Sequence, residues 1–269
     1  MKRKPAVAGY FYPEGEAALR RTLERMVDPL ARKEKAIAVV SPHAGFEYSG
    51  PVAGAVFSSV ELPETYVILG PSHRGRMRAT FAIVREGTWQ TPLGEVPIAQ
   101  DLADHILQGS ELVSVDDQAH ANEHSLEVQL PFIQFYRENI AFVPLCISYD
   151  AAFEELEELG RALAGAIKAA KKDVLIVAST DMSHYVSQKE AEIKDSLAIK
   201  KILELDARGL YETVQSEDIS MCGFQPTTAA IVASKKLGAE KAELIRYQTS
   251  GETTGNFLEV VGYAGLRIR

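Results

Sequence analysis

Short apolar runs alternate along the chain with longer segments in which apolar residues recur every three or four positions. Runs such as VLIVA are apolar at every position, as is typical of strands that are covered on both faces. The amphipathic segment 151–171 carries Phe153, Leu156, Leu159 and Leu163 at helical spacing. This alternation predicts an α/β protein with three layers, in which a central mixed β-sheet lies between helices on both sides.

The same pattern predicts where the individual elements lie. Strands are expected at 37–40, 66–69, 79–84, 140–147, 174–178, 244–248 and 258–266. Helices are expected at 51–59, 99–107, 123–136, 151–171, 190–205 and 226–237. The first of these helices has Pro51 in its first turn, where the missing N–H costs nothing. Because no repeat and no Gly/Ser/Pro-rich linker divides the chain, we expect a single domain over residues 1–269.

Composition and charge exclude several classes of function. The 269 residues carry a formal net charge of −8 and contain no long block of Lys or Arg, which argues against a nucleic-acid or anionic membrane partner. No run approaches the ~20 apolar residues that a membrane span needs. Cys146 lies in an apolar run and Cys222 in a loop-like stretch. Two such cysteines do not form a disulfide framework, so we expect a reducing, cytoplasmic location.

Three of the six histidines follow buried-looking runs. AVVSPHAG places His43 after one run, YVILGPSHRG places His73 after a second, and VLIVASTDMSH places His184 after a third. In open α/β sheets, sites form in the loops at the carboxyl ends of the strands. If these three strands are neighbours, the three imidazoles point into one crevice. The alternative is that each histidine is a hydrogen-bonded loop residue with no shared site.

Cys222 is a candidate fourth member of this group. It lies shortly before Pro226, which is expected in the first turn of a helix. The amino end of a helix favours negative charge, so a nearby thiol should ionise and bind metal more readily. Two imidazoles and one thiolate form a suitable set of ligands for a transition metal.

The segment HANEH at 120–124 allows two interpretations. It fits the H-x-x-E-H pattern of inverted zinc peptidases, in which His120 and His124 would bind zinc and Glu123 would act as the base. Alternatively, Asn122 caps the helix predicted at 123–136, which leaves His120 outside that helix. In this second interpretation His124 lines the crevice and Glu123 orients a neighbouring side chain.

Asp181 lies three residues before His184 and allows three interpretations. Its side chain either orients an imidazole, binds substrate or caps its loop.

Six dispersed motifs connect the chain to a known family. They are AGYFYP, SPHAGFEYSG, ILGPSHRG, NEHSLEVQLPF, STDMSHY and MCGFQPT, in this order over nearly the whole sequence. On these motifs the chain resembles the Memo family, which is named for the mediator of ErbB2-driven cell motility in animals. That family is similar in fold to the second subunit of class III extradiol ring-cleavage dioxygenases, so the resemblance implies an α/β fold of that type.

The resemblance also implies a site. Carried over residue by residue, it makes His43, His73 and Cys222 the metal ligands and His184 the acid/base residue. Asp181, as a second catalytic candidate, and His124 fall in motifs that line the same cleft. Fe(II) is the expected ion, with copper or zinc as alternatives, and redox activity is implied. Where the dioxygenases have a carboxylate ligand, this chain has Cys222. A thiolate is softer and more oxidisable, which argues against ordinary catechol cleavage and favours other metal-centred redox chemistry.

A second hypothesis belongs to a different class of protein. Animal members of the family are linked to signalling partners, and a fold does not fix a function. The cleft would then hold a small molecule or a peptide without catalysing a reaction. The sequence carries no signal of oligomeric state.

Overall fold

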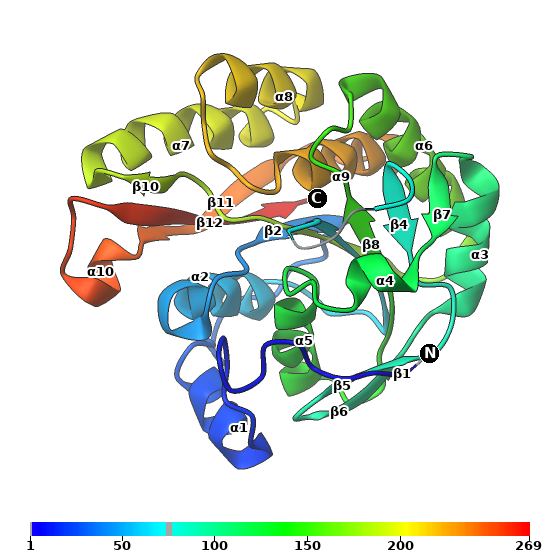
Figure 1. Cartoon of the computed structure of the whole chain (residues 1–269), viewed down its shortest axis with the longest axis horizontal. Coiled ribbons are helices and arrows are strands. Elements are labelled where there is room, and N and C mark those ends of the chain that lie inside the picture. The colour runs from blue at the N-terminus through cyan, green and yellow to red at the C-terminus, as the bar shows by residue number, and fades with distance from the viewer. Residues whose placement is uncertain (1, 74–76) are drawn as a thin grey trace.

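The computed structural model describes residues 2–73 and 77–269. Met1 and residues 74–76 belong to the predicted domain 1–269 but lie outside the described residues. A large mixed sheet runs through the centre, with strand order β10-β12-β2-β9-β3-β8-β4-β7 and with β11 paired to β12 (Figure 1). The strands are β2 Ala38–Ser41, β3 Thr65–Pro71, β4 Phe81–Ile83, β7 Val113–Val115, β8 Ala141–Ile147, β9 Val174–Ser179, β10 His184–Val186, β11 Ala242–Thr249 and β12 Val260–Ile268.

The four middle strands explain the apolar runs. β2, β9, β3 and β8 are mutually parallel, whereas β12 is antiparallel to β2 and β4 is antiparallel to β8. Neighbouring residues of one strand enter different cores, as Val39 and Val40 of β2 do on opposite faces of the sheet. Strands that are buried on both faces have no need of polar alternation.

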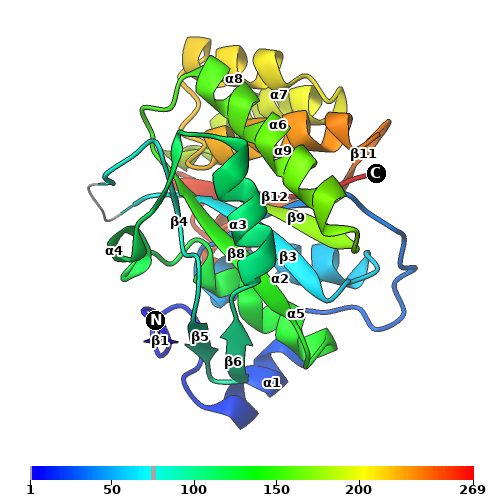
Figure 2. The ribbon, with the colours of Figure 1, turned by 90° about the vertical axis from the view of Figure 1, so that its right-hand side faces the viewer.

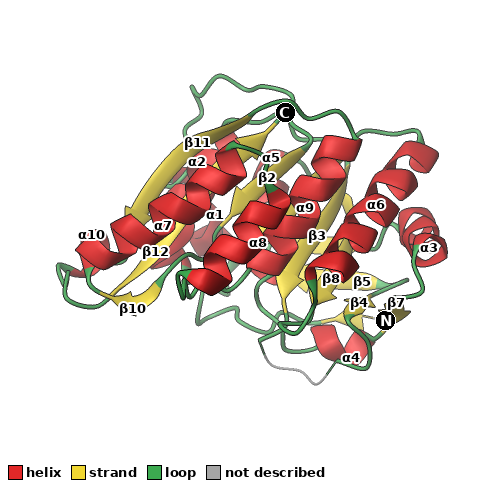
Figure 3. Cartoon of the chain, turned by 90° about the horizontal axis from the view of Figure 1, so that it is seen from above, coloured by secondary structure: helices red, strands yellow, loops and turns green. Residues whose placement is uncertain are grey.

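Helices form the two outer layers. One face of the sheet is covered by α3 Gln100–Gly109, α6 Phe153–Ala170, α7 Gln188–Leu203, α8 Ala207–Ser216 and α9 Phe224–Lys236 (Figure 3). The other face is covered by α1 Glu16–Glu24, α2 Phe46–Ser58 and α5 Leu130–Tyr136. The three-layer α/β architecture is therefore confirmed. Within residues 2–73 and 77–269, no helix combines the length and apolarity that a bilayer span requires.

Shorter elements complete the chain. A small separate sheet is formed by β1 Lys2–Arg3, β5 Thr88–Thr91 and β6 Gly94–Pro97, next to the amino terminus (Figure 2). Single turns of helix lie at α4 Asp117–His120 and α10 Gly251–Thr254, and a 3-10 turn at Glu127–Gln129 leads into α5.

The start of α2 differs from the prediction. The helix begins at Phe46, so Pro51 lies inside it and not in its first turn. Pro51 has no N–H to donate to the carbonyl of Glu47 one turn earlier. That carbonyl accepts a hydrogen bond from the Thr253 hydroxyl at 3.4 Å instead.

The helix predicted at 123–136 is wrong in its first part. Residues 123–126 lie outside any helix, and Asn122 caps none. The cap in this region is Asp116, whose side chain accepts from the amides of Gln118 and Ala119 at the start of α4. His120 therefore ends α4, while Glu123 and His124 lie in the connection that follows.

Candidate metal centre

Three loops bring the predicted site residues to one edge of the sheet. β9 lies between β2 and β3 in the sheet, so the carboxyl ends of these three strands are adjacent. His43, His73 and Asp181 each come two residues after the end of one of these strands. Cys222 reaches the same edge from the segment before α9, and His184 begins β10.

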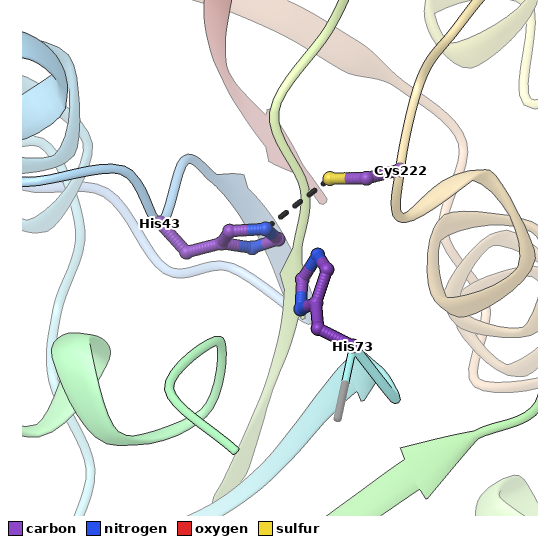
Figure 4. A group of neighbouring side chains, drawn as sticks. All are labelled: His43, His73 and Cys222. Atoms are coloured by element: carbon purple, nitrogen blue, oxygen red, sulfur yellow. Dashed lines mark hydrogen bonds between the residues drawn. The ribbon is translucent and has the colours of Figure 1, made fainter. Parts of the chain in front are cut away.

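The donor atoms of His43, His73 and Cys222 meet. They all lie within 4.8 Å of one another (Figure 4). The Nε2 atom of His43 is 3.2 Å from the Sγ atom of Cys222, although the two residues are 179 positions apart in sequence. The rings of His43 and His73 meet nearly edge to face, with centroids 5.2 Å apart. The predicted convergence of these three side chains is therefore confirmed.

His43 is held with its Nε2 atom facing the centre. Its Nδ1 atom lies 2.9 Å from the hydroxyl oxygen of Ser179. That hydroxyl donates its only proton to the carbonyl of Ser125 at 2.6 Å, so it must accept from Nδ1–H of His43. The lone pair of the ring is then on Nε2. Burial, followed by the nearby His124, His73 and His184, lowers the pKa of His43 well below its usual value, which keeps the ring neutral.

Glu123 holds His73 at two points. Its Oε2 atom accepts the backbone N–H of His73 at 2.6 Å, and its Oε1 atom lies 3.0 Å from Nδ1 of the same residue. The amide of Ser125 donates to Oε1 as well, at 2.8 Å. Burial opposes ionisation of Glu123, but the hydrogen bond and charge of His73 and the charge of His124 outweigh it, so the pKa of Glu123 falls to about 2. With Nδ1 engaged, the Nε2 atom of His73 is the one available at the centre.

His124 lines the same space, as predicted. Its ring stacks on His73 with centroids 4.7 Å apart and packs against Phe11 at 4.8 Å. His73, Glu123 and His124 form a second group whose potential ligand atoms lie within 4.8 Å of one another. Because the Glu123 oxygens already accept three N–H groups, these contacts favour an orienting role for Glu123 over a second metal site.

The thiol of Cys222 differs from the prediction in its ionisation. Its Sγ atom accepts the backbone N–H of Asp181 at 3.2 Å, and Gly223 caps α9 next to it. Burial, and then the charge of Asp181, raise the pKa of Cys222 above its usual value. The lowering of the pKa that was expected from the helix terminus is therefore outweighed by desolvation. A cation at the donor atoms would reverse the balance, since a coordinating thiol loses its proton outright.

Asp181 and His184 lie beside the three donor residues. The Oδ1 atom of Asp181 accepts the backbone N–H of His43 at 2.8 Å, and its Oδ2 atom is 4.0 Å from His43 Nε2. Burial raises the pKa of Asp181. His184 is held by Ser220, whose carbonyl accepts from Nδ1 at 2.8 Å and whose hydroxyl accepts the backbone N–H at 2.7 Å. Asp181 thus holds the backbone of His43, and Ser220 engages Nδ1 of His184, so Nε2 is the ring nitrogen without a hydrogen bond to the described residues.

His120 belongs to a different environment. Its Nδ1 atom lies 2.9 Å from the carbonyl of Asp116, and its ring packs near Trp89 with centroids 6.1 Å apart. Burial lowers the pKa of His120 to about 4. Among the described residues, no group of potential metal ligands includes His120. The structure therefore gives no support to a zinc peptidase site at His120, Glu123 and His124.

Two supporting residues at the site were not predicted from the sequence. Ser179, which fixes the ring of His43, is the last residue of β9, and its only signal is a polar residue at the end of an apolar run. Tyr149 follows β8, and its ring lies 6.1 Å from that of His73. A hollow of 630 Å³ opens beside Tyr149 and is lined by Ser72, Met77, Arg78, Ala79, Thr80, Ser148, Tyr149 and Asp150.

These features define an α/β protein that gathers the side chains of His43, His73, Cys222, Asp181 and His184 at one edge of its central sheet. The family model that matches is that of Memo-like proteins, over residues 3–267, and the chain belongs to this family. The family predicted from the six motifs is confirmed.

Similar proteins span the full chain. MEMO1 family proteins of Methanopyrus kandleri and Methanothermobacter thermautotrophicus are each 40% identical to it, covering 100% and 99% of this chain and 99% and 100% of their own. A MEMO1 family protein of Pyrobaculum arsenaticum is 41% identical, with 98% of each chain covered. The crystal structure of an uncharacterized protein of Escherichia coli K12 has a TM-score of 0.54 at 16% identity, covering 86% of this chain and 99% of that one, and shows a shared fold.

Proposed function

We propose that this protein binds one transition-metal ion through His43, His73 and Cys222 and uses it in redox chemistry on a small ligand. One observation carries the proposal. Both imidazoles have Nδ1 engaged by an oxygen, on Ser179 or on Glu123, which leaves Nε2 of each for the space beside the same sulfur. A hydrogen bond at the second ring nitrogen is the usual way in which proteins orient a metal-binding histidine.

The donor set fits more than one ion. Two imidazole nitrogens and one thiolate suit Fe(II), copper and zinc. We favour Fe(II), because the chain resembles a family whose fold is similar to that of iron-dependent dioxygenases. Three protein ligands leave a coordination position for a small ligand. When bound, iron would supply one-electron redox chemistry at that position.

The remaining residues of the site bind, orient and move protons. His184 presents its Nε2 atom to the ligand, because Nδ1 donates to the carbonyl of Ser220. Imidazole exchanges protons readily near neutral pH, so His184 serves as the acid/base residue. Asp181 keeps His43 in place by accepting its backbone N–H. The aromatic rings of Phe11 and Tyr149 pack against His124 and His73 and border the centre.

The two thiols bear on where the protein works. Cys146 and Cys222 are both free, and a thiolate ligand is oxidised step by step when no reductant restores it. A reducing compartment, such as the cytoplasm, would preserve Cys222 as a ligand.

Elemental analysis tests the metal. The protein is purified without added metal, and iron, copper and zinc are measured per chain. We expect close to one ion per chain in the wild type and none in His43→Ala. His105→Ala is the matched control, because His105 lies on α3 and belongs to no group of potential ligands among the described residues. A folded wild type without metal, even after anaerobic reconstitution with Fe(II), would favour the alternative of a non-enzymatic protein that holds a small molecule or peptide.

A second variant tests the role of His184. We expect His184→Gln to keep its metal and its melting temperature but to lose most metal-dependent O₂ consumption with small phenols. If the variant loses metal as His43→Ala does, His184 is a ligand. If only its melting temperature changes, His184 is structural.

A further inference from the structure

Tyr263 lies on the strand that supports the two catalytic candidates. It belongs to β12, whose residue Gly262 exchanges two backbone hydrogen bonds with the segment between Asp181 and His184. Met182 N–H donates to the Gly262 carbonyl at 2.8 Å, and Gly262 N–H donates to the Ser183 carbonyl at 2.8 Å. Tyr263 is therefore fixed beside this segment by the strand itself.

The alternation of β12 sets the direction of the Tyr263 side chain. Ala264 and Leu266 belong to the core under α6, α7 and α9. Tyr263 and Gly265 consequently face the opposite side of the sheet. Gly265 packs there against Val52 and Val56 of α2. His43, whose backbone is bonded to Asp181, lies three residues before the first residue of α2, so Tyr263 and the centre lie on the same side.

The hydroxyl of Tyr263 has no hydrogen-bond partner among the described residues. The residue is only 2% exposed, yet within residues 2–73 and 77–269 its hydroxyl makes no hydrogen bond. The hydroxyl oxygen is also not fully enclosed by protein atoms, so it opens onto accessible space. By contrast, the hydroxyls of Tyr12, Tyr66 and Tyr247 are bonded to Glu127, the Pro63 carbonyl and Asp195. A buried tyrosine hydroxyl normally has a partner, so an external one is indicated here.

The surroundings of the hydroxyl point to what it would bind. Burial, and then the charges of Asp181, Tyr48 and Tyr185, raise the pKa of Tyr263, so the phenol keeps its proton and acts as a donor. A phenol hydroxyl can donate one hydrogen bond and accept another. A hydroxyl group of a ligand matches it, because that group can accept from Tyr263 and still has its own proton for a second acceptor.

We propose that Tyr263 is a ligand-binding residue, whose hydroxyl donates a hydrogen bond to a hydroxyl group of a small alcohol or phenol held at the metal centre. The inference rests on the proposed function, because the metal centre holds the other end of that ligand. It adds a specificity element on the side of the centre where Asp181 lies.

Binding of catechol to the anaerobic, Fe(II)-loaded protein tests the proposal by calorimetry. Tyr263→Phe removes only the hydroxyl, so we expect catechol to bind three- to tenfold more weakly, the range for one neutral hydrogen bond. Metal content and melting temperature should not change, because the hydroxyl makes no bond within the described chain. Phenol lacks the second hydroxyl and should bind both proteins equally. Tyr66→Phe is the matched control: it removes a hydroxyl bonded at 2.6 Å and should lower the melting temperature without changing the Kd for catechol.

Several results would overturn the role of Tyr263. One is an equal Kd for catechol in the wild type and Tyr263→Phe. Another is an equal loss of catechol and phenol binding, which would indicate ring packing. A third is the failure of both compounds to bind the loaded wild type. Loss of the metal from the wild type is a different failure, because it contradicts the proposed function before Tyr263 is tested.

Discussion

One short segment contributes residues to two polar clusters. The two clusters differ in whether the described chain supplies a positively charged side chain. Within residues 120–127, Glu123 and His124 face the candidate metal centre. His120 and Glu127 face a second cluster, which we term the N-terminal cluster and which consists of Arg3, Tyr12, Trp89, His120 and Glu127. Both clusters contain a buried histidine and a buried carboxylate.

The N-terminal cluster contains its own cation. Nη1 of Arg3 lies 2.6 Å from Oε2 of Glu127, and its guanidinium stacks over Trp89 at 3.9 Å. Arg3 also donates to the carbonyls of His120 and Glu123, each at 2.7 Å. Glu127 accepts further hydrogen bonds from the amides of Ala6 and Val7 and from the hydroxyl of Tyr12. Every formal charge in this cluster is therefore matched.

The candidate metal centre has converging acceptor atoms but no such cation among the described residues. Within the described residues, no Lys or Arg side chain pairs with His43, His73 or Cys222. The comparison teaches that burial of a histidine beside a carboxylate does not identify a metal site. What distinguishes the candidate metal centre from the N-terminal cluster is that the donor atoms of His43, His73 and Cys222 converge where no Lys or Arg of the described chain pairs with them.

The largest effect should come from breaking the N-terminal cluster. Glu127→Gln leaves Arg3 buried without a countercharge, so we expect the free energy of unfolding to fall by about 3–5 kcal/mol. Metal bound per folded chain should stay unchanged, because Glu127 contacts none of the proposed ligands. Urea unfolding combined with metal analysis measures both. A loss of metal affinity at unchanged stability would show that the two clusters act as one.

A smaller effect should appear in the pH dependence of the metal-free protein. His120 has its pKa lowered to about 4 in the fold, whereas an unfolded histidine titrates near ~6.5. Between these values the unfolded chain holds more protons, so the free energy of unfolding falls as the pH decreases from 6.5 to 4. The loss from His120 amounts to roughly 3 kcal/mol over the full range.

Urea unfolding at pH 7 and pH 5 isolates this contribution. His43 acts in the same direction, so the comparison is between the wild type and His120→Gln, both with chelator present. We expect the variant to be the less stable at pH 7 and the difference to shrink by about 2 kcal/mol at pH 5. A constant difference between the two proteins would mean that His120 keeps its ordinary titration in the fold.

The smallest of the three effects should come from loosening the centre. Glu123→Gln disturbs the hydrogen bond that orients His73, so we expect metal affinity to fall about 10- to 100-fold, measured by competition with a chromophoric chelator. Glu127→Gln serves as the matched control for a buried carboxylate outside the centre. If wild type binds two ions and Glu123→Gln binds one, the group of His73, Glu123 and His124 is a second metal site.

The sequence predicted the central sheet well because its signal is local. The runs that became β2, β3, β8 and β9 are apolar throughout, and burial on both faces requires that composition. β10 was not predicted, because its three residues carry no pattern and it forms only by pairing with β12. Asn122 looked like a helix cap, but Asp116 performs that role for α4, and only the tertiary contacts of Glu123 and Arg3 show why the chain turns there.

The convergence of the three candidate ligands was predicted on a different basis. His43 and His73 follow strands that the apolar runs predicted, but only the sheet order shows that both strands flank β9. Cys222 entered through its position before a helix and through the resemblance, which supplied its role. The residues that hold the imidazoles, such as Ser179, could not be found in this way. A serine at a strand end is ordinary, and its importance depends on which ring lies across from it.

The pairing of β12 with β2 also has a consequence for biosynthesis. β2 ends at Ser41, and its partner begins at Val260, so the two edges meet only after more than 200 further residues have been made. At ~5–20 residues per second, the strand that carries His43 waits at least several seconds for this neighbour. Cys222 likewise emerges long after both histidines. The nascent chain therefore exposes the two imidazoles to solvent before the thiol is made. A metal ion held by all three side chains would bind only once translation is nearly over.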